Sequence, residues 1–79
     1  MKKKEPQNQD KIDLKMLSQK IKTLRKETGL SAEVWSYEHK FNRTQYAKYE
    51  RGFDIRFTTL MRLLREMDIK PSEFFKDFD

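Results

Sequence analysis

Residues 30–52 read LSAEVWSYEHKFNRTQYAKYERG, and this stretch decides the fold. Ser31 and Asn42 have short side chains that can accept a hydrogen bond from a free backbone N–H at the start of a helix. Gly52 can adopt the positive φ with which many helices end. The apolar pattern breaks between the two caps, around residues 39–42. The stretch therefore predicts two short helices joined by a tight turn.

The second of these helices, residues 43–51, separates aromatic from polar side chains. Tyr46 and Tyr49 are three residues apart, so they share one face, and we expect both rings to turn toward the core. The other faces carry side chains suited to the major groove of DNA, where Arg binds guanine, Gln binds adenine and Thr contacts thymine. We therefore predict base contacts from Arg43, Thr44, Gln45 and Lys48.

Three sequence phrases, taken together, resemble a known family. They are LRKETGLS at residues 24–31, a helix that ends in ERG at residues 50–52, and TLMRLLREMDI at 59–69 followed by SEFF at 72–75. In this order and at these separations they resemble the Cro/cI-type (XRE) family of helix-turn-helix repressors, over residues 16–75 of the chain. The resemblance implies an all-α, five-helix lambda-repressor-like DNA-binding domain, with the recognition helix 43–51 in the major groove.

The resemblance also implies an ion pair between Arg25 and Glu50 that fixes the recognition helix against the first helix. From the residues alone, Arg25 could instead be solvated while Glu50 pairs locally. Among the places where the chain departs from the family pattern, two concern phosphate binding and the turn. Ala32 stands where the family has a Gln that holds a phosphate. Lys40 replaces the usual turn glycine, so we expect an unfavourable φ or a reshaped turn there.

Contacts to the DNA backbone are expected at the helix starts, in the turn and in the loop after residue 52. The family uses basic residues of that loop on phosphate, and a tyrosine hydroxyl can also reach one. The predicted set is Ser31, Lys40, Asn42, Tyr46, Arg51 and Arg56. One such unit reads only a few base pairs, so we expect a homodimer on DNA that associates through its last two helices.

Outside this block the chain divides into an arm and the rest of the domain. Residues 1–11 are mostly polar and predict a disordered arm, in which Lys2, Lys3 and Lys4 form a solvated tail rather than a phosphate contact. The domain spans residues 12–79 and begins with a helix over 12–28, because apolar residues recur there at helical spacing. This stripe consists of Leu14, Leu17, Ile21 and Leu24.

The last third of the chain predicts two more helices. Thr58 is a candidate cap for the fourth helix. Pro71 suits the first turn of the fifth, where its missing N–H does no harm. Phe74 and Phe75 are expected to close the core, and Phe78 is left for the core or for a dimer surface.

Composition excludes several classes of protein. The chain has 79 residues, one His and no Cys, so it can form no disulfide and no thiolate metal site. A single His cannot build a metal centre alone. No apolar run is long enough to span a membrane, and the N-terminal MKKKEPQNQD lacks the apolar segment of a secretory signal. We therefore expect a cytoplasmic protein with no cofactor or metal.

Charge is distributed unevenly. The formal net charge is +5, which suits a polyanionic partner. Between His39 and Arg62 there are six basic residues against two acidic ones, whereas from Glu66 to the end there are two basic against five acidic. Positive charge thus gathers around the predicted recognition helix, and this asymmetry would orient the molecule on a duplex.

The predicted function is sequence-specific binding of double-stranded DNA by a small transcriptional regulator, with repression as the expected mode. The alternative is a protein-interaction module on the same fold, such as an antitoxin or an accessory subunit, which the departures at Ala32 and Lys40 would suit. An enzyme is disfavoured, because the sequence shows no glycine-rich loop and no paired carboxylates, and we expect no small-molecule substrate. His39 is expected to be a half-buried packing residue rather than a phosphate contact or a pH sensor.

Overall fold

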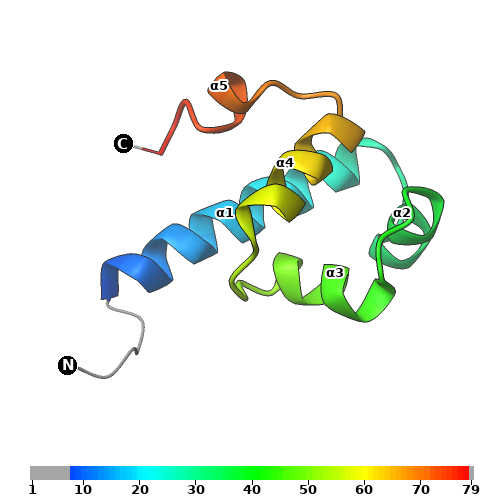
Figure 1. Cartoon of the computed structure of the whole chain (residues 1–79), viewed down its shortest axis with the longest axis horizontal. Coiled ribbons are helices and arrows are strands. Elements are labelled where there is room, and N and C mark those ends of the chain that lie inside the picture. Colours follow the sequence, from blue (N-terminus) through cyan, green and yellow to red (C-terminus); the bar gives the residue numbers. More distant parts are fainter. Residues whose placement is uncertain (1–7, 79) are drawn as a thin grey trace.

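The computed structural model describes residues 8–78, which form five helices and no strand (Figure 1). The helices are α1 (Asn8–Glu27), α2 (Ala32–Glu38), α3 (Arg43–Glu50), α4 (Phe57–Glu66) and α5 (Pro71–Phe74). In Figure 1, α2 and α3 lie on one side of the long α1, and α5 lies on the other. The predicted all-α class is confirmed for the described residues. The predictions for Lys2, Lys3 and Lys4 lie outside them.

The two short helices of the central stretch begin and end where the sequence indicates. The Ser31 Oγ accepts a hydrogen bond from the Val34 N–H at 3.2 Å, and the Asn42 Oδ1 accepts one from the Gln45 N–H at 2.9 Å. Both caps satisfy backbone donors that have no partner within the helix. Gly52 has a φ of 94° and reverses the chain after α3. The predicted pair of short helices is therefore confirmed.

Two predicted helix starts are wrong. The helix α1 begins at Asn8, so residues 8–11 belong to it rather than to a disordered arm. Gln and Lys favour helix without burying apolar area, and the Gln9 Nε2 donates to the Asp13 Oδ1 one turn later at 2.9 Å. The helix α4 begins at Phe57, and Arg56 precedes it without a side-chain capping bond. Thr58 is therefore inside α4 and is not its cap.

The core lies where α1, α2, α3, α4 and α5 meet. Its buried apolar side chains are Ile21, Trp35, Phe41, Tyr46, Leu60, Leu63, Leu64 and Phe74. Trp35 is the largest of them, and its ring centroid lies 5.6 Å from that of Phe41 and 5.1 Å from that of Tyr46. The helix α3 packs against both α1 and α2. These contacts fix which face of α3 remains accessible.

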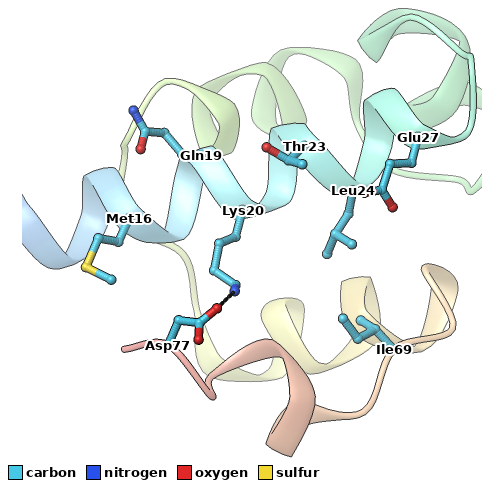
Figure 2. A pocket seen from close by; sticks show the side chains of 8 residues that line it. All are labelled: Met16, Gln19, Lys20, Thr23, Leu24, Glu27, Ile69 and Asp77. Carbon is cyan, nitrogen blue, oxygen red and sulfur yellow. Dashed lines mark hydrogen bonds and ion pairs between the residues drawn. The ribbon is translucent and has the colours of Figure 1, made fainter. Parts of the chain in front are cut away.

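The segment after α4 folds back along α1. Pro71 occupies the first turn of α5, as predicted. Phe74 is fully buried, whereas Phe75 is 38% exposed, so only one of the two residues expected to close the core does so. Figure 2 shows the Lys20 Nζ of α1 paired with the Asp77 Oδ2 at 3.5 Å. This exposed pair and the buried Phe74 join the end of the chain to α1.

The turn between α2 and α3 contains a strained residue. Lys40 has a φ of 63°, a left-handed conformation that costs a residue with a Cβ about 1–2 kcal/mol. Its carbonyl accepts a hydrogen bond from the Arg62 Nη2 at 2.9 Å, and the Phe41 N–H donates to the Ser36 carbonyl at 2.8 Å. The surrounding contacts therefore hold the unfavourable φ that the missing glycine predicts.

Lys40→Gly is expected to raise the free energy of unfolding by about 1 kcal/mol, because glycine adopts this φ without steric cost. For a domain of this size the melting temperature should rise by about 4–8 °C, measured by circular dichroism. Lys40→Ala is the control, since it removes the long side chain but keeps the Cβ. An equal gain in the alanine variant would assign the effect to the lysine side chain instead of the backbone.

Candidate nucleic-acid interface

The helix α3 presents one face to the core and another to solvent. Tyr46 is fully buried, and Tyr49 is partly buried against the same core, with the two rings edge to face at 6.4 Å. Both rings thus turn inward, as their spacing predicts. The predicted base-contacting residues lie on the remaining faces of α3. Arg43, Thr44 and Gln45 are exposed and Lys48 is half-buried.

Hydrogen bonds among the side chains of Arg25, Tyr46 and Glu50 hold α3 in this orientation. The Arg25 Nη2 lies 2.7 Å from the Glu50 Oε1, and the Arg25 Nε lies 2.9 Å from the Glu50 Oε2. The Tyr46 hydroxyl donates to the same Oε2 at 2.6 Å. The side chains of Arg25 and Glu50 are only 11% and 8% exposed. The ion pair that the resemblance implies is therefore formed, and it ties α1 to the last turn of α3.

The hydrogen bonds in this cluster shift the pKa of each member. Burial of the Glu50 carboxyl would raise its pKa, but hydrogen bonds from Arg25 and Tyr46 and the charge of Arg25 outweigh burial, so the pKa lies below its usual value. The hydrogen bond to Glu50 raises the pKa of Arg25 against the opposing effect of burial. Burial, followed by the bond to Glu50, raises the pKa of Tyr46. At neutral pH the cluster is thus a charged pair capped by a neutral phenol.

The prediction of a phosphate contact from Tyr46 is wrong. Its side chain has no exposed surface, and its hydroxyl is already bonded to Glu50. Residue spacing placed the ring on the inner face of α3 but could not reveal the partner of the hydroxyl. The remaining predicted backbone contacts are exposed. Ser31 caps the start of α2, Lys40 and Asn42 lie just before α3, and Arg51 and Arg56 lie at and beyond its end.

The first residue of α3 is paired with α2. The Arg43 Nη1 contacts the Glu33 Oε2, and both side chains are about two-thirds exposed, at 67% and 66%. Such an exposed pair contributes only about 0–1 kcal/mol. A guanine or a phosphate could therefore replace Glu33 as the partner of Arg43 at little cost.

Phe53 contacts the end of α3, and the sequence did not predict this role. It is 49% exposed, and its ring lies 5.8 Å from the Lys48 Nζ and 5.4 Å from the Arg51 guanidinium carbon. The chain reversal at Gly52 brings the ring back over the last turn of α3, where the Phe53 N–H donates to the Lys48 carbonyl at 3.0 Å. The signal in the sequence was an apolar residue directly after a helix-ending glycine, the usual position of such a contact. Phe53 thus orients two cations at the end of α3.

His39 packs as expected. Its ring stacks on Trp35 with centroids 4.2 Å apart, and its Nδ1 lies 2.7 Å from the Glu66 Oε1. The side chain is 27% exposed. His39 is thus a half-buried packing residue that joins the end of α2 to the end of α4.

A further hollow of the described surface lies on the side of α1 that faces the segment after α4. The hollow in Figure 2, of about 410 Å³, is lined mainly by α1 side chains together with Ile69 and Asp77. Within residues 8–78 no group of three or more His, Cys, Asp or Glu side chains could hold a metal ion. None of the described helices is long and apolar enough to cross a membrane.

No protein-family model matches this chain, and comparisons with curated proteins and with solved structures found no match either. The described residues form a small all-α domain. Its short helix α3 is held by buried contacts to Arg25 and exposes a polar face.

Proposed function

We propose that this protein is a sequence-specific, double-stranded DNA-binding regulator of transcription without catalytic activity. In this proposal residues 8–78 form a lambda-repressor-like domain, and α2 and α3 are its helix-turn-helix. One observation carries the proposal. The face of α3 with Arg43, Thr44 and Gln45 is exposed, because both tyrosines of the helix turn into the core. These side chains are the types that read base edges in the major groove.

The starts of α2 and α3 and the segment after α3 supply the positioning contacts in this proposal. Ser31 and Asn42 cap the two helix starts, whose backbone N–H groups attract phosphate. Arg51 and Arg56 supply exposed cations at and beyond the end of α3. Contacts of this kind fix the register of a protein on a duplex, whereas base contacts provide specificity.

Gln45→Ala and Arg56→Ala are expected to affect DNA binding differently. Removal of the Gln45 amide should relax preference at one base position by about 1–3 kcal/mol, whereas removal of the Arg56 guanidinium should weaken binding to all sequences alike and flatten the salt dependence by about one phosphate. A pool of random duplexes, selected and sequenced with each variant, measures the first effect. Titration across a range of salt concentrations measures the second.

The matched control is Lys76→Ala, which removes an exposed cation after α5, a helix on the other side of α1 from α3 (Figure 1). It should leave both preference and salt dependence near those of the parent. Equal losses on every sequence for Gln45→Ala and Arg56→Ala would contradict the proposed division between reading and positioning residues.

We further propose that the protein binds DNA as a homodimer in the cytoplasm and represses transcription. The exposed Phe75, just after α5, supports an association through the last two helices. Paired half-sites about one helical turn apart would then provide the specificity that a single unit lacks.

A second candidate is a protein-interaction module, such as an antitoxin or accessory subunit. It is favoured by Val34 and Tyr37 of α2, which are 42% and 81% exposed. They line a hollow of about 390 Å³ together with Phe41 and the Glu33–Arg43 pair. Titration with random duplex separates the two functions, because only a DNA binder shows a steep fall of affinity with salt.

A further inference from the structure

A groove of about 540 Å³ lies between α1 and the C-terminal end of α3. Its α1 wall includes Lys11, Lys15 and Lys22, and its α3 wall includes Glu50 and Arg51. The three lysines are four and seven residues apart, so they lie along one face of α1. Lys11 and Lys15 belong to the first two turns of α1, and Lys11 lies in the part of the chain for which the sequence predicted a disordered arm.

The lysines of this groove outnumber the carboxylates in its wall, where the charge of Lys22 acts on Glu50 and helps to lower its pKa. Across residues 8–78, none of the three lysines has an ion-pair partner within 4.0 Å. The single carboxylate in the wall, Glu50, is already paired with Arg25 and bonded to Tyr46. The groove therefore presents four cations, from Lys11, Lys15, Lys22 and Arg51, to a ligand. Cations gathered in a concave surface attract anions more strongly than the same cations on a convex one.

The position of the groove relative to α3 fits an extended anion. An eight-residue helix is about 12 Å long, and the major groove of B-DNA is about 12 Å wide. A helix of this length can place its two ends near the two sugar–phosphate walls. Asn42 caps the first end of α3, and the groove lies at the second.

We propose that the groove between α1 and the end of α3 is a phosphate-chain site that holds one sugar–phosphate strand of the bound duplex. This inference rests on the proposed DNA-binding function. It extends the interface from α3 and its flanking loops to the first turns of α1. Lys11 and Lys15 reach phosphates beyond those contacted by Arg51, and they contribute affinity and salt dependence without reading bases.

The test compares the parent with Lys11→Gln/Lys15→Gln and with the matched control Lys70→Gln/Lys76→Gln. Both double variants lose two exposed cations, and circular dichroism checks that each stays folded. Each duplex phosphate contact steepens the slope of log affinity against log salt by about 0.9. The slope of the Lys11/Lys15 variant should therefore be shallower by about two, with an unchanged base preference, while the control keeps the parental slope. Equal slopes in the two double variants would overturn the inference although the parent binds DNA.

A second measurement distinguishes failure of this inference from failure of the proposed function. Tripolyphosphate is titrated into the parent while backbone amide resonances are followed by NMR. We expect the largest shifts at Lys15, Lys22 and Gly52, and their loss in the Lys11/Lys15 variant. If the parent fails to bind any duplex, the proposed function fails, and this pattern alone would still support a phosphate-chain site. Shifts at Lys70 and Lys76 as large as those in the groove would overturn it.

Discussion

Glu50→Gln is expected to lower the free energy of unfolding by about 3–5 kcal/mol, because it leaves the Arg25 guanidinium buried without a counter-charge. The Arg25 side chain is only 11% exposed, so water cannot take the place of the carboxylate. A chain of 79 residues has a total stability of about 4–12 kcal/mol. The loss should therefore remove at least about a quarter of the total stability. Urea unfolding followed by circular dichroism measures the loss.

The pH dependence of this loss has a definite sign. The pKa of Glu50 in the folded protein lies below its usual value of 4.5. A lowered pKa means that the carboxylate stabilises the fold fully above pH 4.5, and that this contribution is lost as pH falls through the folded-state pKa. Glutamine does not titrate. The stability gap between parent and variant should therefore be largest near neutral pH and should narrow in acid.

Glu33→Gln is the matched control, since it removes an acidic partner of a different arginine, Arg43. That pair is about two-thirds exposed, so its loss should cost at most about 1 kcal/mol. Similar losses from both substitutions, or a gap for Glu50→Gln that stays constant down to pH 3, would show that the Arg25–Glu50 pair does not stabilise the fold as described.

The Arg25–Glu50 pair also affects the face of α3 that carries the proposed base-contacting residues. Glu50 is the last residue of the helix, and Arg25 belongs to the last turn of α1. Their pair fixes the rotation of α3 about its own axis, together with the Tyr46 hydroxyl. If α3 were less firmly held, Arg43 and Gln45 would occupy a wider range of positions. Preference for particular bases would then weaken before affinity for the DNA backbone does. Stability and specificity are thus linked through one buried carboxylate.

The sequence predicted those features of the fold that depend only on residues within about one helical turn of each other. Ser31, Asn42 and Gly52 act within one turn of their own position, so their roles could be derived from residue type. The spacing of Tyr46 and Tyr49 predicted which face of α3 turns inward. The absence of glycine at residue 40 predicted the unfavourable φ that Lys40 adopts.

Other features depend on neighbours that no local pattern records. The start of α1 was missed because Gln9 and Asp13 stabilise helix without an apolar stripe. The Tyr46 hydroxyl was assigned to phosphate, whereas it donates to Glu50, whose carboxylate is held at the inner side of α3 by Arg25. Phe53 acquired its role from the chain reversal at Gly52. The lysine groove includes Lys11, which belongs to α1 only because the helix begins about one turn before the predicted start at residue 12.

Phe74→Ala is expected to cost about 3–5 kcal/mol, the usual loss for a large aromatic residue removed from a core. Phe74 has no exposed surface, and its ring centroid lies 5.0 Å from that of Phe75 and 5.9 Å from that of Phe78. The helix α5 contains only four residues, so it cannot be stable without such an anchor. Loss of Phe74 should therefore release the whole segment after α4. Urea unfolding and hydrogen exchange of the α5 amides measure the two effects.

Phe75→Ala is the matched control, because the same side chain is removed one residue further on. More than a third of Phe75 already contacts water, at 38% exposure, so its removal should cost only about 1–2 kcal/mol and leave the α5 amides protected. If Phe75 belongs to a dimer surface, its effect on stability will grow with protein concentration, whereas that of Phe74 will not. Equal and concentration-independent losses from the two variants would mean that Phe74 does not anchor α5 as its burial indicates.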